Sequence, residues 1–255
     1  RMKPHLYVLT GASRGLGLAM AQQLMQPGNS LLCISRHANA LLAQTAAQAD
    51  IPLTQWTHDL IDGEALSHRL QDWLALQGAE AFSSATLINN AGMIPAITPL
   101  SNAHPSELAR ALRVGLEAPM QITSRFLNAT RDWGVPLKVL NISSGLGRRP
   151  MASQSAYCAA KAGLDHFTRC LALDEAQREH GARVCALAPG VVDTDMQVEL
   201  REASAAQFPD QPRFEKLKTQ GLLTSSEEAA RQVLAYLARA DFGSQSVADV
   251  READQ

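Results

Sequence analysis

Tyr157 and Lys161 form a pair of side chains whose types and spacing suit proton transfer. They lie four residues apart in a segment of good helix formers, so a helix projects both from one face. An ammonium beside a phenol stabilises the phenolate and lowers the phenol's pKa from about 10 toward neutrality. The same spacing is common in helices where it has only a structural role. With a suitable third group, the pair predicts that Tyr157 acts as a general acid and base.

Ser144 is the expected third group. It follows the apolar run Lys138–Ile142 and precedes Tyr157 by thirteen residues. A hydroxyl at the carboxyl end of a strand can donate a hydrogen bond to a substrate oxygen and stabilise charge developing there. Ser144, Tyr157 and Lys161 are therefore the predicted catalytic residues.

A glycine-rich segment, Thr10–Gly17, joins the first apolar run, Leu6–Leu9, to a helical pattern over Leu18–Met25. Glycines at this place permit a tight turn and let backbone N–H groups at a helix N-terminus face a pyrophosphate. The segment predicts a dinucleotide site made by Gly11, Ser13, Arg14, Gly15, Leu16 and Gly17.

The second apolar run indicates which dinucleotide binds. An acidic residue at its end would accept the ribose 2′-hydroxyl of NAD. The chain instead has Ser35 and Arg36 there, and a guanidinium suits a 2′-phosphate, to which Arg14 can add a second one. We expect NADP(H); the alternative is that Arg36 is only a solvated charge at a strand end.

These groups need a frame that brings distant loops together. Runs of strand length alternate with stretches of helical spacing, which predicts βαβ units and a parallel sheet with helices on both faces. Because no repeat or linker divides the chain, we expect one doubly wound α/β domain of Rossmann type over residues 2–255, with a mostly parallel seven-stranded sheet. The expected strands are Leu6–Leu9, Ser30–Ser35, Pro52–Trp56, Ala85–Asn89, Lys138–Ile142, Arg183–Ala188 and Ser246–Val250; the longer expected helices are Ala40–Ala49, Gly63–Leu76, Ser106–Asn128 and Gln154–Arg178.

One region, Met196–Gly221, is polar and is expected to be irregular. A long insertion after a strand's carboxyl end can form a lid over a ligand crevice, and a plain surface loop is the alternative. Ser225 and Glu228 have the spacing of a capping box and predict the start of a helix directly after this region.

Bulk properties exclude several classes of partner. The 255 residues have a formal net charge of -2, so nucleic acid and anionic membranes are not expected to bind. No segment approaches the roughly 18 apolar residues of a membrane span. The four cysteines have no CxxC pair and the seven histidines are scattered, which predicts free thiols and no metal site. We expect a cytoplasmic protein that binds small molecules.

The sequence resembles the short-chain dehydrogenase/reductase family over nearly its whole length. The motifs that carry the resemblance are Thr10–Gly17, His58-Asp59-Leu60, Asn89-Asn90-Ala91-Gly92, Ser144, the Tyr157 and Lys161 pair, and Pro189-Gly190 followed by Thr194. The resemblance implies that Lys161 also binds the nicotinamide ribose. It further implies cofactor contacts at Asp59, Leu60, Asn89, Ala91, Gly92, Pro189, Gly190, Val192 and Thr194.

Gly115 departs from the family pattern. The family places an asparagine there, in a Val-Asn-Leu pattern, and its amide helps hold the lysine through water. Here the segment is Val114-Gly115-Leu116, so either a water replaces the amide or the proton relay is weakened.

Within the family, the segment Ala188–Met196 and the tail Asp241–Val250 are similar to the sepiapterin and benzil reductase branch. The resemblance places Asp249 where an aspartate binds the pterin of sepiapterin reductases, and a carboxylate can accept two N–H donors side by side. Asp249 could also be a strand-end charge, and a dicarbonyl or aromatic ketone is an equal candidate for the substrate.

The sequence thus predicts an NADPH-dependent carbonyl reductase with a Ser-Tyr-Lys mechanism, acting on a small ketone or dicarbonyl. The alternative is a catalytically weak regulatory protein that senses NADP(H), which Gly115 favours. The resemblance also implies a homodimer or homotetramer formed through the helices expected at Ser106–Asn128 and Gln154–Arg178.

Overall fold

The sheet contains seven strands in the order β3-β2-β1-β4-β5-β6-β7. The computed structural model describes residues 2–252, so residues 253–255 of the expected domain lie outside the described residues. Each strand is paired in parallel with its neighbours, which confirms the doubly wound fold and is more regular than the mostly parallel sheet expected. The strands are β1 (His5–Thr10), β2 (Asn29–Ser35), β3 (Leu53–Thr57), β4 (Ser84–Asn89), β5 (Leu137–Ile142), β6 (Arg183–Ala188) and β7 (Val247–Asp249).

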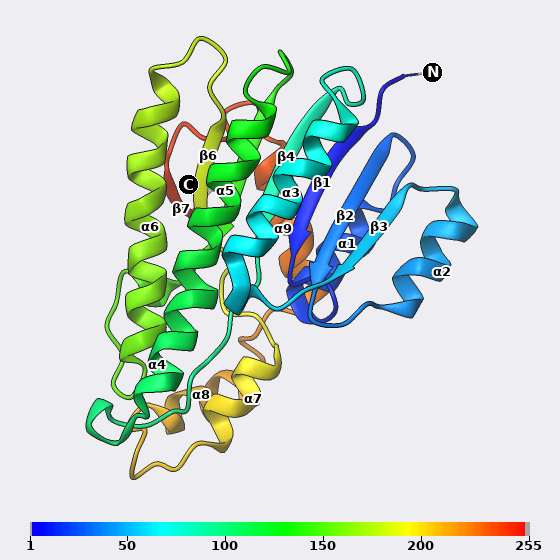
Figure 1. Ribbon diagram of the computed structural model, residues 1–255. Coiled ribbons are helices and arrows are strands. Elements are labelled where there is room, and N and C mark those ends of the chain that lie inside the picture. Colours follow the sequence, from blue (N-terminus) through cyan, green and yellow to red (C-terminus); the bar gives the residue numbers. More distant parts are fainter. Residues whose placement is uncertain (1, 253–255) are drawn as a thin grey trace.

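Helices cover both faces of the sheet. In Figure 1 the helices α3 (Gly63–Gln77), α5 (Ala118–Thr130) and α6 (Ser155–Ala176) lie in front of it, and α1 (Gly15–Leu24) and α9 (Ser226–Ala238) lie behind. The helix α2 (Ala40–Ala49) packs on the α1 side. Because the carboxyl ends of all strands point the same way, the loops that leave them meet at one edge.

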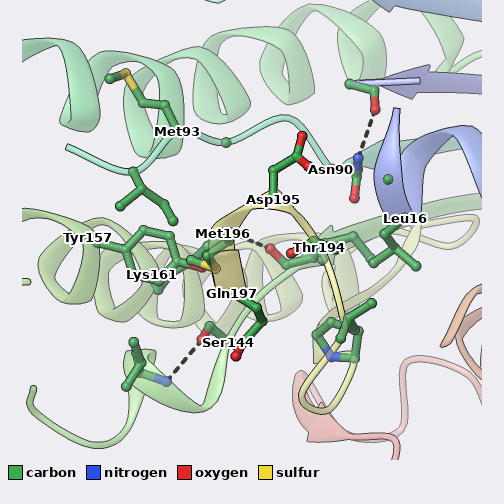
Figure 2. A pocket seen from close by; sticks show the side chains of 18 of the residues that line it. Leu16, Asn90, Met93, Ser144, Tyr157, Lys161, Thr194, Asp195, Met196 and Gln197 are labelled. Atoms are coloured by element: carbon green, nitrogen blue, oxygen red, sulfur yellow. Dashed lines mark hydrogen bonds between the residues drawn. The ribbon is translucent and has the colours of Figure 1, made fainter. Parts of the chain in front are cut away.

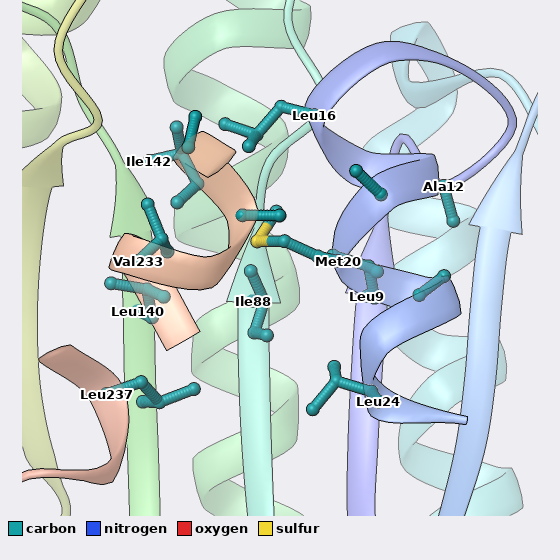
Figure 3. Close-up of a cluster of buried hydrophobic side chains, with 14 of the residues drawn as sticks. Leu9, Ala12, Leu16, Met20, Leu24, Ile88, Leu140, Ile142, Val233 and Leu237 are labelled. Carbon is teal, nitrogen blue, oxygen red and sulfur yellow. The ribbon is translucent and has the colours of Figure 1, made fainter. Parts of the chain in front are cut away.

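Alternation along the strands supplies a core for each face. In β1, Val8 packs into the core under α3 and α5, and Leu9 packs into the core under α1 and α9. Figure 3 shows the second core, where Leu9 and Ile88 of the sheet meet Met20 of α1 and Val233 of α9. A strand buried on both faces must be apolar at successive positions, which is why these runs were recognisable.

The helix expected at Ser106–Asn128 is continuous but contains a π-helical turn. It consists of α4 (Pro105–Leu112), a π-helical turn η3 (Arg113–Glu117) and α5. The Ala118 N–H donates to the Arg113 carbonyl five residues back, and Pro119 has no N–H to continue the usual ladder. Pro119 is the residue in the sequence that indicates this π-helical turn. The π-helical turn places Gly115 against α6.

The expectation that Met196–Gly221 is irregular is wrong. The region contains α7 (Asp195–Glu202) and α8 (Gln211–Thr219), which lie together below the sheet in Figure 1. Leu200, Phe208 and Phe214 form a small buried cluster of their own there, and this cluster stabilises the two helices. The predicted helix start is confirmed, since Ser225 Oγ accepts from the Glu228 N–H at 3.1 Å at the start of α9. The capping box forms only in this half, because the Glu228 carboxylate accepts from Arg231 and Gln232.

Two further findings concern the described part of the chain. None of its helices combines the length and apolarity that crossing a membrane requires. No three of its His, Cys, Asp or Glu side chains gather where they could hold a metal ion.

Candidate active site

A cleft of about 660 Å³ opens at the carboxyl edge of the sheet. Loops after β1, β2, β4, β5 and β6 form its walls, and α7 and α8 form its outer side. All but two of the predicted site residues line it. Those that do are Gly11, Ser13, Arg14, Gly15, Leu16, Gly17, Arg36, Asp59, Leu60, Ala91, Gly92, Ser144, Tyr157, Lys161, Pro189, Gly190, Val192 and Thr194.

The glycine loop has the geometry that a pyrophosphate needs. Gly11 has φ +71°, and a Cβ on it would lie 2.9 Å from Ala91 Cα. A Cβ on Gly17 would lie 1.9 Å from the Gly11 carbonyl oxygen, so only glycine lets α1 start this close to the turn. No side chain caps the N-terminus of α1 and its first turn has no acidic residue. Its N–H groups therefore remain available to an anion.

The asparagine that reaches the cleft is Asn90 and not Asn89. The Asn90 Nδ2 donates to the Gly11 carbonyl at 3.1 Å, beside the turn. Asn89 is 3% exposed, and its Nδ2 donates to Asn141 Oδ1 at 2.8 Å and to Thr123 Oγ1 at 3.1 Å. Neighbouring strand residues point to opposite faces, so the expected cofactor contact of Asn89 is corrected to a buried cross-link between β4, β5 and α5.

Two polar residues follow each other at the end of β2, and they differ in their contacts: Ser35 makes a hydrogen bond within the protein, and Arg36 is exposed. Ser35 Oγ accepts from the Ala12 N–H at 2.9 Å and so fixes the glycine turn against β2. Arg36 is exposed on the wall of the cleft. Arg14 forms an ion pair with Asp195 of α7, with 3.2 Å between Nη1 and Oδ2. This pair joins the glycine loop to the start of α7.

Ser144, Tyr157 and Lys161 converge in the cleft, as Figure 2 shows. Lys161 Nζ lies 5.8 Å from the centroid of the Tyr157 ring and donates to the Ile142 carbonyl at 2.8 Å. Ser144 Oγ accepts from the Leu146 N–H at 3.1 Å, which orients the hydroxyl. One turn of α6 and the end of β5 therefore bring the three side chains together.

Burial shifts the pKa values of Tyr157 and Lys161. It raises the pKa of Tyr157 to about 12, and the hydrogen bond from Ser144 opposes that rise. Burial also lowers the pKa of Lys161 to about 8, against the attraction of the Asp165 carboxylate. At neutral pH the phenol is therefore protonated and the lysine carries a charge, as a proton donor beside a cation requires.

Gly115 leaves no polar side chain beside the lysine. It is buried on the π-helical turn, and a Cβ there would lie 3.1 Å from Ala160 Cβ. A side chain at this position would need α6 to move by a few tenths of an ångström. The departure from the family asparagine thus coincides with close packing of η3 on α6.

Asp249 is not available to a ligand. It is 4% exposed and does not line the cleft. Its Oδ1 accepts from the N–H and Nε of Arg251, each at 2.9 Å, and its Oδ2 accepts from Nη2 at 2.6 Å. The guanidinium already takes both oxygens, so the expected pterin contact is corrected: Arg251, not Asp249, faces the cleft.

Sequence analysis missed the apolar side chains that close the outer half of the cleft. Met196 of α7 lies over Tyr157, with its sulfur 3.9 Å from the Tyr157 hydroxyl (Figure 2). The only available signal was the spacing of Leu200 and Phe214 in a polar region. The apolar lining is Met93, Ile94, Leu146, Met151, Met196, Leu200, Phe214 and Leu217.

Comparison with known proteins identifies the class. The family model for the short chain dehydrogenases matches residues 5–205. The chain belongs to this family of oxidoreductases, as the fold and the arrangement of the cleft also indicate.

Several individual members of the family are similar to this chain over most of its length. The chain is 36% identical to the benzil reductase ((S)-benzoin forming) of Bacillus cereus over 235 residues, which cover 92% of this chain and 94% of that protein. It is 34% identical to the sepiapterin reductase of Meriones unguiculatus, over 93% of this chain and 92% of that one. Among solved structures, the KRED1-Pglu enzyme superposes with a TM-score of 0.79 at 26% identity, covering 96% of this chain and 99% of that one.

Proposed function

We propose that this protein uses NADPH to reduce an apolar ketone or dicarbonyl, with Tyr157 as the proton donor. The observation that carries the proposal is the convergence of Ser144, Tyr157 and Lys161 in a cleft beside a glycine loop. The similarity to benzil and sepiapterin reductases supports carbonyl reduction.

Each of the three side chains has a distinct part in the proposed reaction. The nicotinamide supplies the hydride when it is bound. Ser144 donates a hydrogen bond to the carbonyl oxygen and stabilises the negative charge that grows on it. Tyr157 then gives its phenolic proton to that oxygen. The Lys161 ammonium stabilises the phenolate that remains.

The residues of the inner half fit a dinucleotide. The free N–H groups at the start of α1 and the close approach at Gly11 suit the pyrophosphate. Arg36 makes no hydrogen bond or ion pair within residues 2–252, so its guanidinium is available to a 2′-phosphate. NADP(H) is therefore our proposed cofactor over NAD(H).

The outer half favours an apolar substrate. Three methionines, Met93, Met151 and Met196, line it, and thioethers adapt to and contact aromatic rings favourably. Asp249, the carboxylate expected to hold a pterin, is occupied by Arg251. These features favour a benzil-like aromatic ketone or dicarbonyl over a pterin.

The proposed assembly rests on the family resemblance, and the proposed location rests on the free thiols and the absence of a long apolar segment in the sequence. Met120 of α5 and Leu173 of α6 are exposed apolar residues on helices expected to pair. We propose a cytoplasmic homodimer or homotetramer, and light scattering of the purified protein measures which one forms.

The test is oxidation of NADPH and of NADH with benzil, sepiapterin, simple ketones and aldehydes, with Tyr157→Phe beside the unaltered protein. We expect turnover with NADPH on the aromatic dicarbonyls and a loss of about 1,000-fold in Tyr157→Phe, within the range for removal of a general acid. NADPH binding, followed by fluorescence, is expected to persist in the variant. Full activity in Tyr157→Phe would refute the mechanism. Binding without turnover on any compound would favour the NADP(H) sensor.

A further inference from the structure

A buried carboxylate lies one turn of α6 beyond Lys161. Asp165 is 1% exposed, and carboxylates are almost never buried so completely unless they are paired. Neither the sequence motifs nor the proposed chemistry use it. The contacts of Asp165 show which part of the chain it fixes in place.

Asp165 holds the segment that follows β5. Its Oδ1 accepts a short hydrogen bond of 2.5 Å from Ser143 Oγ, and its Oδ2 lies 3.3 Å from Arg148 Nε. Arg148 in turn donates to the Ala248 carbonyl at 2.9 Å, at the end of the sheet. A Cβ on Gly147 would lie 2.9 Å from Oδ2, so the 3₁₀ turn η4 (Gly145–Gly147) folds directly around the carboxylate.

This segment contains the proposed catalytic serine. Ser143 stands between Ile142, whose carbonyl accepts from Lys161 Nζ at 2.8 Å, and Ser144. Lys161 and Asp165 thus bind two consecutive residues of the chain from one face of α6. The position of Ser144 relative to Tyr157 follows from these two contacts.

Asp165 also supplies negative charge that acts on Lys161, four residues before it on α6. The lysine is 7% exposed and its hydrogen-bond acceptor, the Ile142 carbonyl, is neutral. Gly115 gives it no polar partner from η3. Burial lowers the pKa of Lys161 to about 8, and the Asp165 carboxylate acts in the opposite direction.

No other titratable group that we find on the elements around α6 supplies negative charge to Lys161. Arg148 faces the same carboxylate and opposes its effect, and Tyr157 is neutral below about pH 12. Cys185 of β6 is a neutral thiol, since burial raises its pKa to about 12. The remaining charged groups on these elements are exposed or bonded elsewhere: Glu107, Arg110, Arg113, Glu117, Lys138, Arg149, Arg183 and Asp249. On α6 itself, His166, Arg169 and Asp174 are exposed, and Glu175 accepts from the Ala182 N–H.

We infer that Asp165 is a positioning residue of the proposed reductase, which holds Ser144 through Ser143 and Arg148 and keeps Lys161 an ammonium beside Tyr157. This inference rests on the proposed function, because it gives Asp165 a part in that reaction. Asp165 supplies a charge interaction at the lysine that does not need a side chain at position 115.

The first test measures the lysine directly, without substrate. The protein is labelled with ¹³C-lysine, the Lys161 signal is assigned by its loss in Lys161→Met, and its titration is followed by NMR. Asp165→Asn keeps the shape and removes the charge, so we expect the midpoint of Lys161 to fall by about one pH unit. Asp174→Asn, an exposed carboxylate on the same helix, is expected to leave it unchanged. An unchanged midpoint in Asp165→Asn overturns the inference.

A second variant tests the charge of Asp165 by removing the cation that pairs with it. Arg148→Met leaves Asp165 without its cation, so the carboxylate acts on Lys161 with its full charge and the midpoint is expected to rise. Shifts of opposite sign in the two variants follow from electrostatics and not from general loosening of the fold. The Arg148→Met variant tests the charge effect of Asp165 even where Asp165→Asn folds poorly. A Lys161 midpoint that falls or stays unchanged in Arg148→Met contradicts the inference.

The third measurement is the pH profile of kcat in the proposed reduction. Lys161 is protonated below its pKa, and that state is lost as the pH rises through about 8. With the midpoint lowered by one unit, Asp165→Asn is expected to lose about fivefold at pH 8 and to recover near pH 6. An equal loss at every pH would mean a purely structural role. Absence of turnover in the unaltered protein would remove the proposed function, and the NMR midpoints would still decide the charge role of Asp165.

Discussion

The two halves of the cleft are built in different ways. The inner half consists of backbone at the carboxyl ends of β1, β2 and β4, where glycines allow close approach and N–H groups are left free. The outer half consists of apolar side chains carried by α7, α8 and the loops facing them. The inner half therefore depends on which residues lack a side chain, and the outer half depends on how side chains fill space.

This difference explains where a substitution is tolerated. A Cβ added at Gly11 or Gly17 would meet the backbone of the loops that directly follow β4 and β1, which has little room to move. A side chain shortened in the outer half changes the shape of the cleft but leaves the sheet intact. We therefore expect a side chain added at the close approaches of the inner half to abolish binding, and changes in the outer half to alter which substrate is preferred.

Gly11→Ala is expected to have the largest effect. Gly11 has φ +71° and its added Cβ would lie 2.9 Å from Ala91 Cα, so the turn must open and the pyrophosphate site is lost. We expect NADPH affinity to fall by at least about 100-fold, measured by fluorescence titration.

Gly28→Ala is the matched control for this variant. Gly28 also has a positive φ, +90°, but nothing lies within 4 Å of the added Cβ. It is expected to lower the melting temperature and leave NADPH affinity unchanged. Equal affinity in Gly11→Ala and the unaltered protein would show that the glycine loop does not form the site.

Arg36→Ala tests a charged contact proposed for the inner half. Loss of a guanidinium from a 2′-phosphate is expected to raise the Kd of NADPH about tenfold to thirtyfold and to leave that of NADH unchanged. Arg178→Ala, an exposed arginine at the far end of α6, is the control for general charge. A parallel loss for both dinucleotides would place Arg36 outside the phosphate site.

The inner half was largely predictable from the sequence, for a physical reason. Gly11 and Gly17 are needed by backbone geometry, and Ser144, Tyr157 and Lys161 are placed by strand ends and helical spacing. Asn89 shows the limit of that approach. One residue along a strand reverses the direction of a side chain, and the motif alone did not tell Asn89 from Asn90.

The outer half was not predictable, because it depends on contacts between side chains distant in sequence. Met196, for example, contacts Tyr157, which lies 39 residues earlier in the chain. Leu200, Phe208 and Phe214 stabilise two helices in a region whose polarity indicated a loop. No local pattern encodes these contacts, although Pro119 did mark the π-helical turn.

Met196→Ala tests the proposal that the outer half selects the substrate. Removal of the thioether that lies 3.9 Å from the Tyr157 hydroxyl enlarges the space above the catalytic pair. We expect kcat/KM for bulky diaryl ketones to rise relative to small ketones by about fivefold, with NADPH KM unchanged. Val198→Ala, on an exposed position of the same helix, is expected to keep the original ratio. An unchanged ratio in Met196→Ala would mean that α7 does not limit substrate size.

Asp195→Asn is expected to have the smallest effect, because it removes an exposed ion pair between the glycine loop and α7. Arg14 and Asp195 are both exposed and lie 3.2 Å apart, and such pairs are weak in water. The pair nevertheless competes with a 2′-phosphate for the Arg14 guanidinium, so its removal is expected to lower the NADPH KM by about twofold and leave that of NADH unchanged. Steady-state kinetics at low salt, where exposed charges act most strongly, is the measurement. A higher NADPH KM would mean instead that the ion pair holds α7 over the bound cofactor, and the two halves would then be coupled through Arg14.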